Sequence, residues 1–528
     1  MLNGTVADNL IDSLRADLHA ASFTTDALNG LWGTEAAAAL FRGLRVPALR
    51  ASRRKRALGS GTSALATLGR LFVLGVPVAV RELADALPTL GVLGAAMLEL
   101  IQVRAIDGGG EAVHPLLDLR PYSFSDSRGD GSWWIASDLG ELALGHAIPE
   151  GHVLGIGRAS TTLSGLMIAD PVDSVLDLGT GCGIQALHAS RHARRVVATD
   201  TSERALELAR FNARLNGIDS IEYRLGSLFE PVDAEQFDQI VSNPPFVITP
   251  RTPGVPAYEY RDGGMTGDAL VAAVIRGAAQ HLRPGGIAQL LGNWEYHVHE
   301  AAFERVGGWL NDCAADGSAL DAWVIEREVL DCAEYAETWI RDGGTRAGTA
   351  EFDRLYSAWL DDFEARDVRA VGFGYLTLRR PKTGAPTLRR LEKVMTHGSN
   401  ESGLGARLAA TLRAHDWLAA RDDSALGSAT LSVAPDVTEE RHYWPGADDP
   451  TVITLHQGGG FGRAMPAGTA LAAFVGACDG ELTVAAICAA LAQLLEVGES
   501  ALRAELLPQV RELIFTGFLL TDGSAGAA

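Results

Sequence analysis

The residues best suited to chemistry lie between positions 175 and 246. Residues 175–178 are typical of a buried strand, which runs into the turn Gly179-Thr180-Gly181-Cys182-Gly183 before a helix begins. Such a turn needs glycine where the backbone approaches a ligand closely or takes a positive φ. The next strand, residues 195–199, ends on Asp200, 23 residues after Asp177. A carboxylate at that place suits the two hydroxyl groups of a ribose.

The glycine turn alone does not identify the ligand. A dinucleotide-binding turn needs Gly-x-Gly-x-x-Gly, and the sequence Gly179-x-Gly181-x-Gly183 does not supply it. A further strand, residues 237–241, ends on Ser242-Asn243-Pro244-Pro245-Phe246. Open α/β sheets build their sites where parallel strands end, so we expect this polar, proline-fixed loop to lie beside the glycine turn.

Together these two motifs resemble class I S-adenosylmethionine (SAM) methyltransferases that methylate a planar NH2 group. Residues 177–183 are similar to the SAM-binding loop of that superfamily. Residues 243–246 are similar to its amino-methylating motif, which occurs in adenine-N6, guanine-N2 and glutamine-N5 enzymes. The resemblance covers residues 150–381. It implies an α/β fold with a Rossmann-like core of seven strands, and SAM as the cofactor.

The resemblance also implies how the motif acts. The methyl group of SAM is already activated on a sulfonium, so the enzyme must place a weak nitrogen nucleophile in line with it and exclude water. The side-chain oxygen of Asn243 would accept one N–H of the acceptor, and the carbonyl of Pro244 would accept the other. Pro244 and Pro245 fix φ, and Phe246 would stack on a flat group. These four residues are the predicted catalytic set.

The predicted cofactor site follows from the same resemblance. The three glycines of the turn would leave room for the amino-acid end of SAM, Asp177 would bind its amino group directly or through water, and Asp200 would hold the ribose. Ser227 and Leu228 would border the adenine, with serine standing where related enzymes commonly carry aspartate. The full predicted set is Asp177, Gly179, Thr180, Gly181, Gly183, Asp200, Thr201, Ser227, Leu228 and Asn243.

Some residues favour a protein substrate and others favour a nucleic acid. The acidic charge and residues 255–264, which are similar to a segment of release-factor glutamine methyltransferases, favour a protein glutamine, and this is the interpretation we prefer. Phe246 stands where those enzymes usually carry tyrosine, and with the basic runs at 50–56 and 379–393 it favours adenine-N6 or guanine-N2 in RNA or DNA. A SAM-binding scaffold is disfavoured, because the Asn243 motif is intact.

The composition limits which partners and which cellular compartment suit the protein. The 528 residues carry a formal net charge of −21, which disfavours generic binding to a polyanion. Five scattered cysteines with no Cys-x-x-Cys pair argue against a metal site and favour a reducing, cytoplasmic compartment. The first residues lack a signal-peptide pattern, and the apolar runs are too short for a membrane span. The basic runs are more often solvated loops than phosphate sites. Oligomeric state is not indicated.

Periodicity predicts three domains. Residues 1–120 are mostly helical and end in the order helix, turn, helix, helix, hairpin, which is typical of a winged helix. Residues 121–381 would be the methyltransferase domain, with a bridge at 121–150 and a helical insertion at its edge, 332–368. Residues 382–528 would form a second winged-helix-like domain, whose helix 499–513 is kinked or broken at Pro508.

The central domain is predicted to alternate strand and helix, with its last two strands as an antiparallel edge pair. The bridge would hold a strand at Trp133-Trp134-Ile135, followed by a helix cap at Ser137-Asp138. The two tryptophans would pack at a domain seam. The predicted strands are 174–178, 195–199, 222–225, 237–241, 286–291, 322–328 and 371–378, and the predicted helices are 184–190, 203–216, 269–282 and 300–313.

Overall fold

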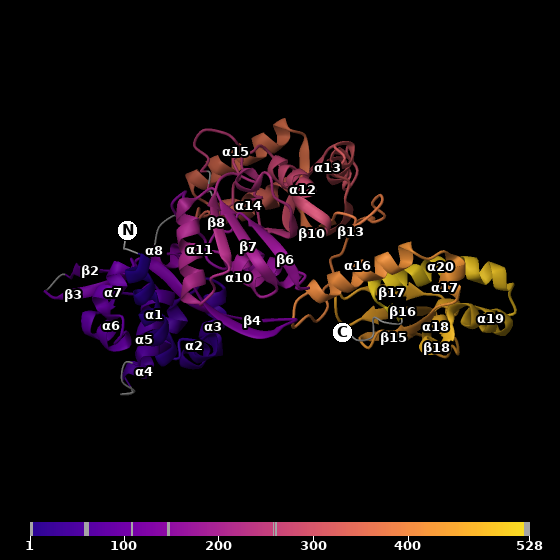
Figure 1. Ribbon diagram of the computed structural model, residues 1–528, viewed down its shortest axis with the longest axis horizontal. Helices are drawn as coiled ribbons and strands as arrows, with labels where there is room; N and C mark the ends of the chain where they lie inside the picture. The colour runs from indigo at the N-terminus through magenta and orange to yellow at the C-terminus, as the bar shows by residue number, and fades with distance from the viewer. Residues whose placement is uncertain are drawn as a thin grey trace. The chain divides into compact units, whose positions relative to one another are not determined.

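The computed structural model of the chain describes residues 4–57, 63–106, 109–144, 148–256, 258 and 261–521 (Figure 1). It divides into two compact units. The first consists of Met1–Ser164, Pro171–Val324 and Glu328–Pro386, and the second of Gly165–Asp170, Ile325–Arg327 and Thr387–Ala528. The residues with predicted chemistry all lie in the first unit. The boundaries of the three predicted domains stay a prediction.

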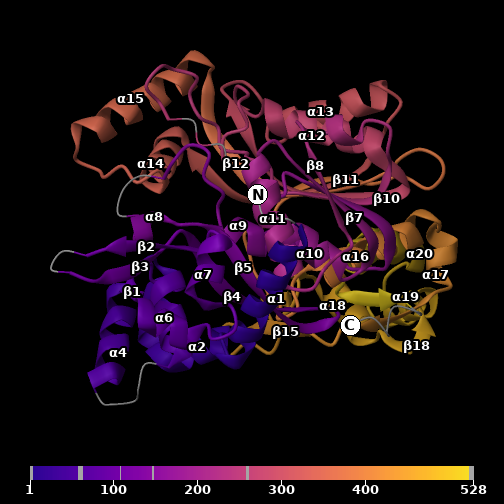
Figure 2. The same ribbon diagram turned by 60° about the vertical axis from the view of Figure 1, so that its left-hand side comes forward.

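The largest sheet, most of whose strands belong to the first unit, is mixed and has the strand order β13-β11-β12-β10-β9-β6-β7-β8; several of its strands are labelled in Figures 1 and 2. The strands from β10 through β8 run parallel, and β12 is antiparallel to β10. All seven predicted strands are present, so the predicted α/β core is confirmed. Their bounds are β6 Val172–Leu178, β7 Ala193–Asp200, β8 Ile221–Leu225, β9 Phe237–Ser242, β10 Leu282–His297, β11 Asp321–Asp331 and β12 Val368–Arg379.

The sheet has eight strands and not the predicted seven. The additional strand, β13 (Arg389–Lys393), lies in the second basic run, which we expected to be a solvated linker. Because β13 follows β11 in the strand order, β11 and β12 are not the edge pair that the sequence predicted. Charged residues can form such an edge strand, since only one side of its backbone is hydrogen-bonded to the sheet.

The register of the parallel strands brings the site residues together. Leu178 at the end of β6 pairs with Thr199 of β7 and with Ser242 of β9. The residues that follow these strand ends therefore meet at one edge of the sheet. Helices α10 and α11 pack beside β6, β7 and β8, and helices α12 and α13 pack beside β10. Their bounds are α10 Ile184–Ser190, α11 Glu203–Leu215, α12 Ala269–His281 and α13 Glu304–Ala315.

The N-terminal part has the predicted order of helix, turn, helix, helix and hairpin, with a small sheet in the order β1-β3-β2. The winged-helix interpretation of this order stays a prediction. The glycine turn of the hairpin is described only in part, because Gly108 lies outside the described residues. The elements are α1 Gly4–Ala20, α5 Ala64–Leu68, η1 Gly69–Val73, β1 Val78–Ala79, α6 Val80–Ala86, α7 Gly91–Met97, β2 Ile101–Ala105 and β3 Glu111–Pro115.

Three N-terminal helices were not predicted: α2 (Thr25–Trp32), α3 (Thr34–Phe41) and α4 (Val46–Ala57). The first basic run lies in α4, so the expectation of a loop there is wrong. Helix α4 forms because its other side packs on α2 and α3, and there the indole N–H of Trp32 donates to Ser52 Oγ at 2.9 Å. This tertiary contact fixes a helix that its charge run does not favour.

The bridge is a long hairpin of β4 (Leu117–Asp126) and β5 (Gly129–Asp138). Ser137 and Asp138 lie in β5 and do not cap a helix, because they pair with Asp118 and Leu117. The short α8 (Glu141–Leu144) follows, and α9 (Arg158–Leu166) precedes the core sheet. The backbone N–H of Trp134 donates to the Asn216 side chain, and its indole N–H donates to the carbonyl of Phe23. Trp134 thus joins the N-terminal helices to the core, as predicted.

The insertion between β11 and β12 forms two helices, α14 (Cys332–Asp342) and α15 (Ala350–Ala365). They share a hydrophobic cluster with Val247 and Ile248, the residues just after Phe246. Tyr335 of α14 is buried in this cluster, and its hydroxyl accepts the backbone N–H of Ile248 at 3.0 Å. The insertion therefore anchors the loop that leaves the Asn-Pro-Pro-Phe motif, a role that its predicted place at the domain edge did not suggest.

The second unit has its own hydrophobic core and two three-stranded sheets, β18-β14-β19 and β15-β16-β17. Helix α20 continues through Pro508 without the predicted break, because flanking residues such as Leu506 and Val510 are held in the core. A kink at Pro508, which was the other predicted outcome, stays a prediction. The elements are α16 Gly405–Ala419, α17 Asp423–Gly427, β14 Thr430–Val433, β15 Val437–His442, β16 Val452–Gln457, β17 Ala464–Ala467, α18 Thr469–Gly476, β18 Asp479–Thr483, α19 Val484–Leu494, α20 Glu499–Thr516 and β19 Leu519–Thr521.

This second unit differs from the predicted winged helix in one respect. Strand β14 lies between β18 and β19, antiparallel to both, just as β3 lies between β1 and β2. In the N-terminal part the middle strand β3 belongs to the closing hairpin and follows both of its partner strands in the chain, whereas β14 precedes both of its partners. The two small sheets thus share an arrangement but not a chain order.

Candidate functional site

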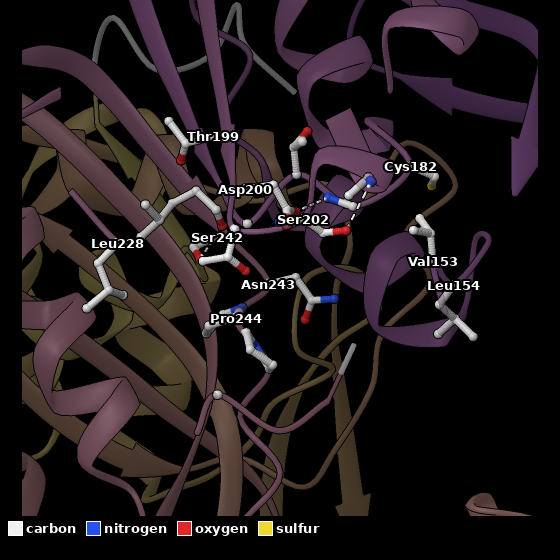
Figure 3. A pocket seen from close by; sticks show the side chains of 18 of the residues that line it. Val153, Leu154, Cys182, Thr199, Asp200, Ser202, Leu228, Ser242, Asn243 and Pro244 are labelled. Atoms are coloured by element: carbon white, nitrogen blue, oxygen red, sulfur yellow. Dashed lines mark hydrogen bonds between the residues drawn. The ribbon is translucent and has the colours of Figure 1, made fainter. Parts of the chain in front are cut away.

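A cavity of about 420 Å³ opens at the carboxyl edge of β6, β7 and β9 (Figure 3). In the close view Leu228 lies at one end, Val153 and Leu154 lie at the other, and Asn243 lies between them. Most of the predicted site residues meet here. Those that line the cavity are Gly179, Thr180, Gly181, Asp200, Thr201, Ser227, Leu228, Asn243, Pro244 and Pro245. Three predicted residues do not line it: Asp177, Gly183 and Phe246.

The glycine turn has the backbone form that the sequence predicts. Gly179 and Gly181 have φ values of 76° and 54°, and no atom lies within 4 Å of where a Cβ would stand on either. The backbone N–H groups of Gly179 and Thr180 both donate to the carbonyl of Thr199 at 2.9 Å. These two positions therefore present bare backbone to the cavity, which is what close approach of a ligand requires.

Gly183 has a different role from the one we predicted. Its φ is 88°, and a Cβ added there would lie 2.9 Å from the Cβ of Ala209 in α11. The glycine thus lets the start of α10 pack closely on α11, and it does not make room for a ligand.

Asp177 lies fully buried behind the turn. One carboxylate oxygen accepts the hydroxyl of Thr180 at 2.6 Å and the backbone N–H of Ala186 at 2.9 Å, while Oδ1 has no partner. Burial raises the pKa of Asp177 to about 7. A buried acceptor without a partner is costly, so Oδ1 fits a donor group reached through water, as predicted for the amino group of SAM.

Asp200 holds the turn and also faces the cavity. Its Oδ2 accepts the backbone N–H of Gly181 at 2.9 Å, and its Oδ1 accepts the N–H of Ser202 at the same distance. Burial raises the pKa of this carboxyl as well. Leu228, at φ 48°, takes a left-handed conformation that costs a non-glycine residue about 1–2 kcal/mol. The turn begins at Gly226, whose N–H donates to the carbonyl of Asp200 at 3.0 Å, and residues 227 and 228 line the cavity after it.

Asn243 presents a buried acceptor to the cavity. Its Oδ1 has no hydrogen-bond partner among the described residues. The hydroxyl of the preceding Ser242 donates to the carbonyl of Leu178 at 2.7 Å and fixes the end of β9 to β6. The carbonyl of Pro245 accepts the N–H of Gly263 at 3.1 Å, whereas that of Pro244 accepts no hydrogen bond from a described residue. Asn243 Oδ1 and Pro244 O thus accept no hydrogen bond from a described residue, and their role toward the acceptor nitrogen stays a prediction.

Phe246 does not contribute to the cavity wall. Its ring lies 5.4 Å from that of Phe373 between centroids, and it packs against the insertion cluster. Its backbone forms an isolated bridge with Asp262. We therefore revise its predicted role from stacking on the acceptor to positioning the motif.

Two stretches of the cavity wall were not predicted from the sequence. Residues His152, Val153 and Leu154 cover one end, and they are held there because Asp138 accepts the N–H of Val153 at 2.9 Å. No motif marks them. The other stretch, residues 262–265, lies in the segment whose similarity we noted, but its buried Asp262 was not singled out. Glu259 and Tyr260 of that segment lie outside the described residues.

Comparison with known families identifies the core. Residues 155–313 match the family described as the methyltransferase small domain. This stretch of the chain is therefore similar to methyltransferase small domains. The match bears out the predicted class I core and SAM as the cofactor that such a core binds. Residues 20–112 and 409–521 match two domains of unknown function, DUF7059 and DUF7782.

The domain is similar to curated glutamine methyltransferases. The ribosomal protein uL3 glutamine methyltransferase of Bradyrhizobium diazoefficiens is 33% identical over 206 residues, which cover 37% of this chain and 60% of that protein. A release factor glutamine methyltransferase of Xylella fastidiosa is 40% identical over 129 residues, 23% of this chain and 47% of that protein. The chain thus spans about half the length of these relatives.

Among solved structures, the YcgJ protein of Bacillus subtilis matches with a TM-score of 0.28 and 16% identity, covering 43% of this chain and 99% of that one. No helix in the described part of the chain has the length and apolar character needed to cross a bilayer. The described residues also contain no cluster of His, Cys, Asp and Glu side chains that could hold a metal ion.

Proposed function

We propose that the protein is a SAM-dependent N-methyltransferase that methylates a glutamine side chain of another protein. The observation that carries this choice is the composition of the cavity wall. None of the described residues that line it is Phe, Tyr or Trp. A flipped-out base is commonly held by stacking on such rings, whereas a glutamine amide is small and needs only its two N–H groups to be bound.

Other features support a protein acceptor. The relatives with the same domain are named for glutamines of ribosomal protein uL3 and of release factors. Part of the second basic run, which had favoured RNA, is paired with carboxylates: Arg379 pairs with Asp321 at 2.7 Å and Lys393 with Glu326 at 2.9 Å. The cytoplasmic location and the winged-helix interpretation remain predictions that fit this function.

The chain's residues would act on the acceptor in a defined way. When SAM is bound, it supplies a methyl group that is already activated on a sulfonium. Asn243 Oδ1 and Pro244 O would accept the two N–H groups of the amide, which turns the nitrogen lone pair toward the methyl. The rigid prolines hold these acceptors in place, and the insertion, through Tyr335 and Ile248, holds the loop. The described residues provide orientation. As the N–CH3 bond forms, the nitrogen loses one of its two protons to water, so that the product is the neutral methylamide.

The substrate class can be tested directly. Purified protein and SAM labelled in the methyl group would be added to a cell lysate, and the labelled fraction split by protease and by nuclease. We expect protease-sensitive label, and peptide mass spectrometry should place one added methyl on glutamine. Nuclease-sensitive label would instead establish the alternative, adenine-N6 or guanine-N2 methylation. Absence of transfer with SAM still bound would indicate a SAM-binding scaffold.

Asp200→Ala should weaken SAM binding by about 1–3 kcal/mol, roughly 10- to 100-fold, because the ribose hydroxyls lose their acceptor and the glycine turn loses a contact. Titration calorimetry measures this directly. Asp173→Ala is the matched control, since Asp173 is exposed and pairs only with Arg194. Equal affinity of Asp200→Ala and wild-type protein would contradict the assigned ribose site.

SAM affinity should depend on pH through Asp177. With its pKa at about 7 in the free protein, Asp177 is largely protonated below that pH. A nearby ammonium group favours the carboxylate, so binding releases a proton, and affinity should rise by up to about tenfold per pH unit toward 7 and then level off. Calorimetry across this range, repeated with Asp177→Asn, measures the effect. Parallel profiles for the two proteins would exclude a role of Asp177 in binding.

A further inference from the structure

Helix α4 presents a basic face on the first unit. Arg50, Arg53 and Arg54 are all exposed, and their i, i+3, i+4 spacing places them on one side of the helix. None of the three forms an ion pair or hydrogen bond with a described side chain. In a chain with a formal net charge of −21, three adjacent unpaired cations are not explained by stability.

The packing of α4 fixes this face toward solvent. Ala48 and Ser52 are buried, and Ser52 Oγ donates to the carbonyl of Ala48 while it accepts the indole N–H of Trp32. The buried residues of α4 thus face α2 and α3, and the arginines point the other way. The face is formed by a helix that tertiary contacts hold, so its charges have a fixed spacing.

The second basic run provides a contrast within the same chain. Arg390 pairs with Glu392 at 2.8 Å and with Glu512 at 2.7 Å, so its charge is used inside its own unit. The run on α4 lacks such carboxylates. Of the two basic runs that the sequence shows, only the one on α4 leaves its described arginines available to an external anion.

We propose that the α4 face binds the phosphate backbone of RNA and serves as a docking surface apart from the methyl-transfer cavity. Guanidinium groups suit phosphates, which they can bind in a bidentate manner. No aromatic residue lies among the three arginines, so the contact is to the backbone and not to the bases. This inference does not rest on the proposed function, because no residue of α4 lines the cavity.

RNA fits this face better than an acidic protein segment does. Protein partners are usually bound through aromatic or large apolar anchors at the centre of a patch. The exposed Val46 lies one turn before Arg50, at the end of the basic face, and no such side chain lies between the three arginines. A polymer with evenly spaced phosphates can neutralise all three charges at once. An acidic peptide is the alternative ligand, and the experiment below compares its binding with that of RNA.

The test uses the full chain and a labelled RNA duplex, with affinity followed by fluorescence anisotropy over a range of salt concentrations. The variant is Arg50→Glu, Arg53→Glu and Arg54→Glu combined. The matched control reverses three other exposed arginines, Arg81, Arg194 and Arg413, each of which has a carboxylate partner. Both proteins undergo the same change in net charge, so a general electrostatic effect would act equally on them.

We expect the α4 variant to lower the slope of log affinity against log salt by about 2–3, as loss of three phosphate contacts requires, and to lose at least about tenfold in affinity at low salt. The control variant should keep most of the wild-type salt slope and most of the wild-type affinity. Equal loss in the two variants, or no RNA binding by the wild-type chain, would overturn the proposal. So would binding of a polyglutamate peptide in preference to RNA, which would assign the face to an acidic protein. Circular dichroism would show that α4 is retained.

Discussion

Asn243→Ala is expected to lower methyl transfer by about 10²–10³ while SAM binding stays nearly unchanged. The buried Oδ1 of Asn243 has no partner among the residues that the structure describes, so we expect it to orient the substrate nitrogen. Removal leaves only the carbonyl of Pro244 for this purpose. The glycine turn and Asp200, which face the cofactor end, are not touched by the change.

Single-turnover transfer and calorimetry of SAM separate the two effects. Asn243→Asp is the informative companion variant, because it keeps an acceptor oxygen but adds a charge, and we expect it to fall between the wild type and Asn243→Ala. Wild-type turnover by Asn243→Ala would rule out the amino-methyltransferase assignment. It would point to an O- or C-methylating enzyme, or to a SAM-binding scaffold.

Trp359→Ala is expected to destabilise the first unit by about 3–5 kcal/mol, since Trp359 is 2% exposed and a large cavity would remain. Because Trp359 shares a cluster with Val247 and Ile248, the loop after the motif should lose its anchor. Thermal unfolding measures the first effect. Transfer assays below the unfolding range should show a larger loss of transfer than of SAM binding.

Phe474→Ala is the matched control for this prediction. Phe474 is fully buried in the core of the second unit, so its truncation should cost a similar free energy there. Transfer at low temperature should be nearly normal in this variant. If Trp359→Ala kept normal transfer once folded, the insertion would be a passive addition to the fold.

The parts that could be predicted from the sequence are those whose determinants are local. The parallel strands are continuous apolar runs because both of their faces are buried, and Val175 and Leu176 of β6 are fully covered. The positive φ of Gly179 and Gly181 needs glycine whatever lies around it. Asn243 and the prolines sit at the end of a strand, so their place at the sheet edge followed from the strand itself.

The parts that could not be predicted depend on distant partners. Gly183 is constrained by Ala209, and Phe246 is held by Phe373. The sequence around Gly183 and Phe246 does not indicate either contact. Residues 152–154 reach the cavity only because a hairpin carboxylate binds them. Strand β13 is a run of charges that pairs at a sheet edge. In each case the determining neighbour lies far away in the chain.

The place of the insertion in the chain has a consequence for biosynthesis. Chains are made from the N-terminus, and their parts fold as they emerge. The turn, Asp200 and Asn243 are synthesised well before α14 and α15, which anchor the loop beyond Phe246. A nascent chain could therefore gain the cofactor cavity first and the ordered acceptor loop later. We expect the newly made protein to bind the methyl donor before it becomes competent to modify a substrate.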